Sequence, residues 1–344
     1  MTDKKRSNLI ISSAAAAGIA IDETQDAAES GAESELRQVA APLHCHGERL
    51  DRTLAEIVPE FSRSYLQQLI VAGAVQHNGV VQVKSSARVK AGDALIIELK
   101  PTPQSQAFKP EPMDIDVVFE DEFLLVINKP AGLVVHPAPG NWSGTLLNGL
   151  LARDARAYLL PRAGIVHRLD KDTSGLMVVA RQRQTMDQLV EMIAARSVNR
   201  QYLGLAHGEW RGAKTRHADF PVGRDPKNRL RMAVVDLEKT SGKAAATDIT
   251  MLESGPQYCL VQCKLHTGRT HQIRVHMSAL GHPLVSDVMY GGPMAGGLQR
   301  QALHACRLEF QHPVTDNVMS FNAALPEDML AALANVGLRY NLAS

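Results

Sequence analysis

The sequence predicts an α+β protein in which a mixed, mainly antiparallel sheet is preceded by a small α/β module. Two observations carry this prediction. Beyond residue 113, short β-branched runs alternate with Gly and Pro, and few segments keep a helical period. Before residue 100, two apolar stripes at helical spacing precede an Asn-Gly turn signal. Strands that follow one another through short loops favour antiparallel pairing.

Composition restricts the class of protein. The chain has 344 residues, of which 45% are hydrophobic, and this suffices for about two packed domains. No apolar run reaches the ~20 residues of a membrane span, so no membrane association is expected. Four cysteines are too few for a disulfide scaffold and none forms a C-x-x-C pair, so we expect a reducing, cytoplasmic location.

Charge is distributed unevenly along the chain. The first 47 residues hold four Lys/Arg and seven Asp/Glu, a net charge of −3, so the rest of the chain carries +4. A mildly basic body permits a polyanionic partner without requiring one.

Residues 1–47 are rich in Ala, Ser and Glu and poor in large apolar residues. Such a composition does not offset the entropy of ordering, so we predict a disordered tail. The alternative is a secretory signal, because a basic cluster at 4–6 precedes an apolar stretch over 9–21. Two serines interrupt that stretch and nothing downstream needs an oxidising compartment, which favours the tail.

Residues 48–100 form the small module. Apolar residues recur at helical spacing over 50–58 and again after Ser62, which is placed to cap the second helix. An Asn-Gly turn then joins two short strands over 74–83, and a further strand covers 94–99.

Basic side chains surround this module: Arg49, Arg52, Arg63, Lys84 and Arg88. On charge alone, an ordinary solvated face explains them. They also suit phosphate contacts, which set position and affinity on a nucleic acid but carry little sequence information.

A Pro-rich segment over 101–112 predicts a semi-rigid linker, and a second domain occupies residues 113–344. Its predicted helices cover 145–151 and 185–195. Its predicted strands are the β-branched runs at 117–119, 123–127, 165–166, 176–180, 202–206 and 259–265.

Three polar clusters interrupt the second domain, at 128–137, 164–175 and 266–276. Loops held by a rigid sheet are where chemistry is usually placed. We interpret Asp172 as a turn residue, and the histidines of the third cluster as structural or nucleic-acid-contacting residues, because none has a metal-ligand spacing. No metal site is therefore expected. Ser174 lacks the sequence frame of a hydrolase nucleophile.

One carboxylate in the second cluster, Asp170, is flanked by Arg168 and Lys171. A cation beside a carboxyl group keeps that group ionised. Such an aspartate can act as a nucleophile or as a base without any cofactor, and the residues leave both roles open. The Arg-rich third cluster is placed to supply a cationic partner.

The three clusters carry the strings N-K-P-A-G-L-V-V-H-P, H-R-L-D-K-D-T-S-G-L and T-G-R-T-H-Q-I-R-V-H. In this order they resemble the signature motifs of the ribosomal large-subunit pseudouridine synthases. The first module, with its R-L-D-R-T-L, S-R-S and N-G segments, resembles the S4 RNA-binding module. Together the resemblances extend from Glu48 to Leu330, and the preceding tail lies outside them.

The resemblance implies roles for single residues. Asp170 matches the catalytic carboxylate, Arg269 its basic partner, and Tyr202 the aromatic residue that stacks on the target base. Arg168 matches the residue that fills the gap left in the RNA by the extruded uridine, and Lys129 is placed among the RNA-binding residues. Pseudouridine formation keeps all atoms of the substrate, so no cofactor is expected.

The resemblance also implies a substrate, 23S rRNA or a precursor of the large ribosomal subunit, with loop uridines of the helix 69 stem-loop as targets. Other rRNA or tRNA uridines are an alternative. A non-catalytic RNA-binding assembly factor would not need Asp170, Tyr202 and Arg269 together, and a hydrolase would need an acid/base pair that is missing. We expect a monomer with no obligate protein partner.

Overall fold

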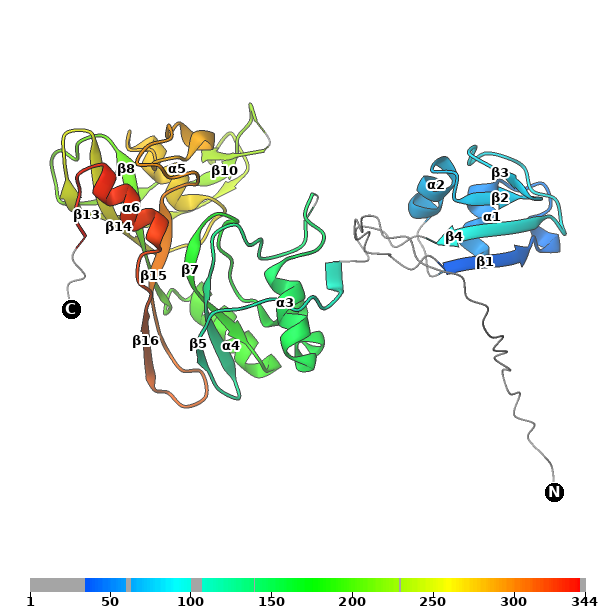
Figure 1. Cartoon of the computed structure of the whole chain (residues 1–344), viewed down its shortest axis with the longest axis horizontal. Helices are drawn as coiled ribbons and strands as arrows, with labels where there is room; N and C mark the ends of the chain where they lie inside the picture. The colour runs from blue at the N-terminus through cyan, green and yellow to red at the C-terminus, as the bar shows by residue number, and fades with distance from the viewer. Residues whose placement is uncertain (1–34, 60–62, 100–106, 139, 229, 341–344) are drawn as a thin grey trace, which may run out of the picture. The chain divides into compact units, whose positions relative to one another are not determined.

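The computed structural model describes residues 35–59, 63–99, 107–138, 140–228 and 230–340. The chain divides into two compact units, Met1–Pro101 and Thr102–Ser344 (Figure 1). Most of the predicted tail and the predicted cap Ser62 lie outside the described residues. Among the described helices, none is long and apolar enough to cross a bilayer.

The first unit consists of two helices and a four-stranded antiparallel sheet of order β1-β4-β2-β3, as the hydrophobic period predicts for all but β1. Its elements are β1 (Glu35–Ala40), η1 (Leu43–Cys45), α1 (Leu50–Ile57), α2 (Arg63–Val71), β2 (Val75–His77), β3 (Val80–Val81) and β4 (Ala94–Leu99). Asn78 and Gly79 both have positive φ, which the tight turn between β2 and β3 requires.

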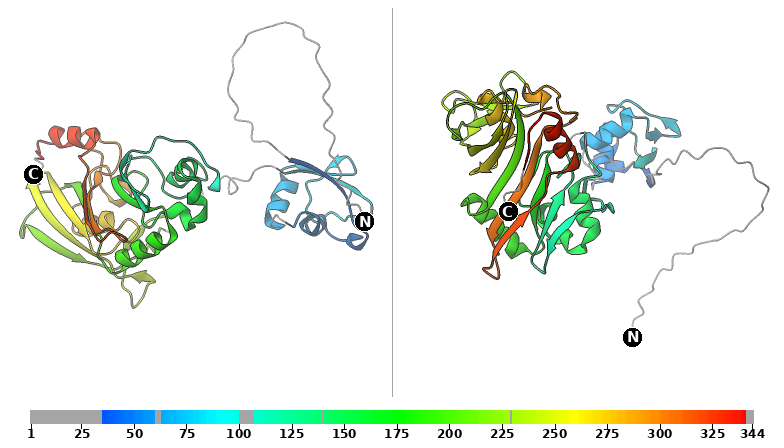
Figure 2. Two further views of the ribbon diagram at one scale, coloured as in Figure 1. Left: turned by 90° about the horizontal axis from the view of Figure 1, so that it is seen from below. Right: turned by 60° about the vertical axis from the view of Figure 1, so that its left-hand side comes forward.

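The helices of this unit pack against its sheet (Figure 2). Leu50 and Leu54 of α1, Leu66 and Ile70 of α2, and Ile97 of β4 are fully buried in one cluster. Buried residues recur every three or four positions along the helices and every second position along β4. The unit therefore forms where the apolar faces of both helices meet one face of the sheet.

The prediction of disorder over 1–47 is wrong for its last residues. Glu35–Ala40 form β1, which pairs along its whole length with β4. The composition of this segment did not indicate a strand because β1 buries little apolar surface; Leu36, for example, is 68% exposed. The strand is held mainly by backbone hydrogen bonds to the edge of β4, a partner that local composition does not reveal.

The second unit is built on a nine-stranded, mainly antiparallel sheet of order β5-β6-β7-β15-β8-β14-β13-β9, with β16 paired to β15. These strands are β5 (Val117–Glu120), β6 (Leu124–Lys129), β7 (Ser174–Ala180), β8 (Asn199–His207), β9 (Thr215–Asp219), β13 (Ala246–Ser254), β14 (Tyr258–Leu265), β15 (Leu303–Gln311) and β16 (Val318–Asn322). Among the described strands, β7 and β15 form the one parallel pair. The predicted α+β class is confirmed.

A separate small sheet contains β10 (Val222–Arg224), β11 (Met232–Val234) and β12 (Gly242–Lys243). The helices of the unit are α3 (Leu146–Arg153), η3 (Ala155–Leu159), η4 (Pro161–Gly164), α4 (Arg183–Ala194), α5 (Gln272–Ala279), η5 (Val288–Tyr290) and α6 (Glu327–Asn335). The predicted helices correspond to α3 and α4. The predicted strand at 165–166 is a single bridge from Ile165 to Val179.

The interpretation of 266–276 as one loop is wrong from Gln272 onward, where α5 begins. The helix was missed because its polar residues are buried along with its apolar ones. Gln272, Arg274 and His276 are each less than 10% exposed, so the segment has no polar face to reveal the helical period.

The predicted linker over 101–112 is too long. Residues 101–106 lie outside the described part, but from Ala107 the chain packs on α3. Asn148 Nδ2 donates to the carbonyl oxygens of Ala107 and Lys109 at 3.4 and 2.8 Å. The Asn148 backbone carbonyl oxygen accepts from Glu111 N at 3.1 Å. One buried residue therefore fixes, through its side chain and its backbone, a segment that composition assigned to a linker.

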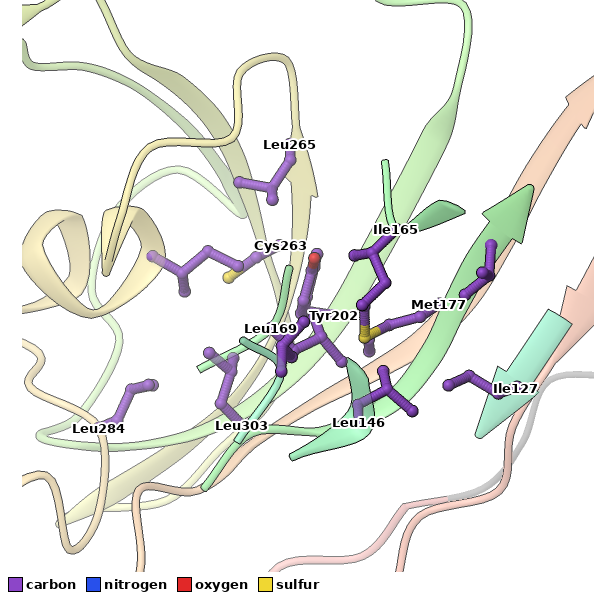
Figure 3. Close-up of a cluster of buried hydrophobic side chains, with 14 of the residues drawn as sticks. Ile127, Leu146, Ile165, Leu169, Met177, Tyr202, Cys263, Leu265, Leu284 and Leu303 are labelled. Carbon is purple, nitrogen blue, oxygen red and sulfur yellow. The ribbon is translucent and has the colours of Figure 1, made fainter. Parts of the chain in front are cut away.

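The largest core cluster of the second unit carries the loop that precedes β7 (Figure 3). Ile165 and Leu169 of this loop pack with Met177 of β7 and Tyr202 of β8. Cys263 of β14 lies in the same cluster and is fully buried, as expected of a core thiol. The loop over 165–173, called the Asp170 loop below, is thus anchored from beneath.

We predict that Gly175→Ala destabilises the second unit more than Gly212→Ala. Both glycines have positive φ, but a Cβ on Gly175 would lie 2.2 Å from the Ala305 carbonyl oxygen, whereas nothing lies within 4 Å at Gly212. The control carries only a conformational cost of about 1 kcal/mol. The clash at Gly175 adds about 1–3 kcal/mol.

Urea unfolding followed by tryptophan fluorescence measures this difference, because both tryptophans, Trp142 and Trp210, belong to the second unit. Equal losses in the two variants would show that the approach of β7 to β15 does not constrain residue 175.

Candidate active site

A cleft of about 750 Å³ in the second unit collects residues from three distant segments. The Asp170 loop contributes Arg168 and Asp170, and β8 contributes Arg200 and Tyr202. The segment from Leu265 into α5 contributes Arg269, His271 and Arg274. The structure thus brings together the second and third polar clusters, and His136 of the first cluster also lines the cleft.

Arg274 of α5 orients Asp170. Its Nη1 donates to Asp170 Oδ2 at 3.2 Å, and the carboxylate is 15% exposed. Its Nε and Nη2 each donate to Asp287 at 2.7 Å. Burial alone would lower the pKa of Arg274, but pairing with Asp287 and Asp170 raises it above its ordinary value. Arg274 is therefore a permanent charge that holds Asp170 in one orientation.

His271 lies on the other side of Asp170. Its Nε2 is 3.8 Å from Asp170 Oδ1, and its Nδ1 shares a 2.7 Å hydrogen bond with the Tyr290 hydroxyl. The Tyr290 ring also stacks on the Arg274 guanidinium at 4.8 Å. Burial lowers the pKa of His271 below its usual value, so the ring is neutral at neutral pH. Asp170 therefore faces one permanent cation and one neutral imidazole.

The prediction that Arg269 pairs with Asp170 is wrong. Arg269 Nε donates to the Ala244 carbonyl oxygen at 3.0 Å, although its side chain also lines the cleft. The sequence does not show where a loop side chain points, whereas Arg274 stands on α5 and its Nη1 reaches Asp170. A signal was present in the sequence: Arg274 stands between Ile273 and Val275, and a cation inside an apolar run indicates a buried, paired charge.

Tyr202 and Arg168 occupy different depths. Tyr202 is 5% exposed and its ring lies among Ile165, Leu169 and Cys263 (Figure 3). Burial raises the pKa of Tyr202 to about 12, so its hydroxyl stays protonated. Arg168 is exposed at the cleft. The cleft thus combines a buried aromatic side chain with an exposed guanidinium.

The placement of Lys129 among the RNA-binding residues is wrong. Its side chain is 1% exposed, and its Nζ donates to the carbonyl oxygens of Pro130, Leu133 and Lys171 at 2.8, 2.9 and 2.9 Å. Burial lowers the pKa of Lys129 to about 8. Because Lys171 follows Asp170, Lys129 ties the first polar cluster to the Asp170 loop. A cation at the end of a strand was mistaken for a surface residue.

Two basic residues of the first unit are organised by a fully buried acid, Asp51. Arg49 Nε donates to Asp51 Oδ1 at 3.0 Å, and Arg63 Nη2 donates to Oδ2 at 2.9 Å. Hydrogen bonding, first from Arg49, holds the pKa of Asp51 well below its usual range despite its burial. The two guanidinium side chains stay 41% and 50% exposed, so they are fixed in position and still accessible.

The other predicted basic residues of this unit are on its surface. Arg52 forms an exposed ion pair with Glu48, in which the two atoms are 3.4 Å apart. Arg88 Nη1 donates to the Gly47 carbonyl oxygen at 2.8 Å, and Lys84 is exposed.

Among the described residues, two groups bring three potential metal ligands within 4.8 Å of one another: His44, Cys45 and Glu56, and His217, Asp248 and His266. In the second group, Asp248 shares 2.6 Å hydrogen bonds with both histidines. These contacts cross between strands, so spacing along the chain did not indicate them. The carboxylate already serves both rings as a hydrogen-bond acceptor.

Residues 123–279 match the family model described as RNA pseudouridylate synthase, and residues 48–95 match the S4 domain. The chain is 44% identical over 332 residues to Ribosomal large subunit pseudouridine synthase D of Neisseria meningitidis serogroup B, which covers 92% of this chain and 86% of the relative. The chain belongs to the RNA pseudouridine synthase family. It is therefore an isomerase.

Other pseudouridine synthases support this assignment. A relative from Xylella fastidiosa with the same name is 45% identical over 311 residues, covering 87% of this chain and 92% of the relative. An uncharacterised RNA pseudouridine synthase of Bacillus subtilis is 42% identical over 292 residues, covering 84% and 94%. Human RNA Pseudouridylate Synthase Domain Containing 4 shares the fold, with a TM-score of 0.51 at 24% identity, covering 65% of this chain and 94% of that one.

We predict that K129M destabilises this synthase and lowers its activity without changing the salt dependence of RNA binding. The substitution leaves three carbonyl oxygens without their donor, at a cost of about 1–3 kcal/mol each where they stay buried. One of them belongs to the Asp170 loop. K84A, at an exposed position in the first unit, is the control with the opposite expected result. Its stability should be unchanged, and the dependence of its RNA affinity on salt concentration should be weaker.

The same residue predicts a pH dependence. The pKa of Lys129 is about 8 in the folded protein against 10.5 ordinarily, so between those values the unfolded chain binds more protons. Stability contributed at this site therefore rises with pH across that window, and K129M should lack the rise. A reduced salt slope in K129M, or an identical pH profile, would contradict the assignment of Lys129 to the interior.

Proposed function

We propose that this synthase converts uridines of large-subunit ribosomal RNA to pseudouridine, with loop uridines of the helix 69 stem-loop of 23S rRNA as its targets. The observation that carries the proposal is the 44% identity, over 92% of the chain, to a synthase whose name states that it acts on the large ribosomal subunit. The first unit, matching the S4 domain, supports an RNA partner. Cytoplasmic ribosome precursors would be the natural substrate for a monomer of this kind.

Asp170 is the proposed catalytic carboxylate. The reaction breaks the bond between ribose and a base nitrogen, turns the base, and rejoins it through carbon, so every atom of the substrate is kept. Arg274 supports this role because its Nη1 donates a hydrogen bond to the carboxylate at 3.2 Å and holds it at the cleft. A protein that only binds RNA would have no use for a carboxylate in a cleft meant for a polyanion.

Tyr202 and Arg168 are proposed to handle the extruded uridine. The glycosidic bond cannot be reached inside a stacked helix, so the nucleotide must leave the stack. The buried ring of Tyr202 offers a surface on which the base stacks, which is worth about 1–3 kcal/mol. Arg168, exposed at the cleft, is placed to fill the vacated gap in the RNA.

The basic residues of the first unit are proposed phosphate contacts that position the RNA. Arg49 and Arg63 are held by Asp51 with part of each side chain accessible, and Lys84 and Arg88 are exposed. Arg52 joins them at the surface. Such contacts add affinity for any RNA, so target choice falls to the cleft.

We predict that Asp170→Asn abolishes pseudouridine formation while RNA affinity stays within a few fold. The substitution removes the charge needed for chemistry but none of the cations that contact phosphate. Asp172→Asn, two residues away, is the matched control and should keep activity.

The measurement is pseudouridine mapping across 23S rRNA from cells that lack the protein and carry either variant or wild type. Sites lost in the deletion and restored by Asp170→Asn would remove Asp170 from catalysis. If the deletion removes pseudouridines outside helix 69 instead, the proposed target is wrong and those positions are the substrate.

We predict that Arg168→Ala slows conversion of a paired uridine more than that of a loop uridine. Filling a vacated stack matters only where stacking is lost. Single-turnover conversion of two synthetic RNAs, which differ only in the pairing of the target, measures the effect. Equal losses on both RNAs would make Arg168 a general positioning residue.

A further inference from the structure

Arg200 is a buried cation without a counter-ion in the described part of the chain. It lies on β8, is 6% exposed and lines the cleft. Its Nε is buried with no hydrogen-bond partner, and no ion pair or hydrogen bond to its side chain is formed by the described residues. Arg274, equally buried, has two carboxylate partners. Arg200 therefore differs from the other buried arginine of the cleft.

An uncompensated buried charge is expensive, because desolvation disfavours the ion and nothing in the protein offsets it. The surroundings of Arg200 do not relieve this cost. His167 beside it is neutral: burial, with Arg200 second, lowers its pKa to about 3. Six arginines line the described cleft against a single carboxylate, Asp170, which Arg274 already binds. Among the described residues, the Arg200 side chain therefore has an open place for an anion that enters the cleft.

The position of Arg200 restricts what that anion is. Arg200 and Tyr202 are two residues apart on β8, so both side chains project from the same face, about 7 Å apart. A base stacked on Tyr202 therefore has its own sugar-phosphate near Arg200. Gly268 leaves room for the guanidinium, because a Cβ at that position would lie 2.9 Å from Arg200 Nη1. Arg200 of β8 and Gly268 of the third polar cluster therefore lie next to each other in the lining of the cleft.

We propose that Arg200 binds a phosphodiester group adjacent to the extruded nucleotide, so that the RNA supplies the counter-ion that the described residues do not provide. The proposal rests on the RNA-modifying function argued above and adds a substrate-positioning residue to it. A phosphate contact of this kind stabilises the bound substrate and the transition state equally. Its loss raises KM and leaves kcat nearly unchanged.

The test uses the full-length protein and a stem-loop RNA that carries one uncharged methylphosphonate linkage, placed in turn at each position around the target uridine. With wild type, neutralising one linkage next to the target should raise KM about tenfold or more. In R200M, that RNA and the unmodified RNA should give the same KM. R196M, an Arg→Met change at an exposed position of the same cleft, should respond to the modified RNAs as wild type does.

Three further measurements separate binding from folding. R200M should melt at or above the temperature of wild type, because it removes an unpaired buried charge. Inorganic phosphate at constant ionic strength should raise the melting temperature of wild type and R196M but not of R200M. G268A, which crowds Nη1 while keeping the charge, should raise KM in the same direction as R200M.

The outcomes distinguish this inference from the proposed substrate. Wild type that fails to convert the helix 69 stem-loop, yet responds to phosphate through Arg200, would refute the substrate and support the phosphate site. Equal phosphate responses in wild type and R200M, or equal sensitivity of both to every neutralised linkage, would overturn the role of Arg200. A large loss of stability in R200M would assign it to the structure of the core instead.

Discussion

The bidentate pair between Arg274 and Asp287 is the interaction on which the candidate active site depends. Two hydrogen bonds of 2.7 Å fix the plane of the guanidinium, which leaves Nη1 as the donor that reaches Asp170. Asp287 is 2% exposed, so removing either partner would leave a buried charge and cost about 3–5 kcal/mol. The same pair that stabilises the fold therefore also sets the direction of the Asp170 carboxylate.

The Asp170 loop is held from several sides. Leu169 enters the core beneath it, and the Lys171 carbonyl oxygen accepts from both Lys129 Nζ and Gly132 N at 2.9 Å. Beyond the loop, Gly175 contacts β15 more closely than any side chain would allow. If Asp170 is the catalytic carboxylate, as proposed, a loop held in this way needs little reorganisation when substrate binds, which is the condition for electrostatic catalysis.

The placement of charged side chains, buried or exposed, says more about this protein than its net charge does. A net charge of +1 would not mark a nucleic-acid enzyme. Yet the described cleft presents six arginines and one carboxylate, and in the first unit a buried aspartate holds two arginines at the surface. Buried carboxylates hold arginines whose side chains face the cleft or the solvent. The electrostatic potential at these surfaces is therefore more positive than the net charge of the chain indicates.

The sequence by itself determined the fold class, the helices of the first unit, the Asn78-Gly79 turn and the position of Asp170 in a motif. Hydrophobic period and turn chemistry are local, and the motif strings are contiguous, so each can be recognised in one dimension. Tertiary structure alone decided that Arg274 and not Arg269 meets Asp170, that Lys129 points inward, and that Glu35–Ala40 form a strand. Each of these depends on a partner remote in the chain: the phase of α5, three carbonyl oxygens around one ammonium group, and the free edge of β4.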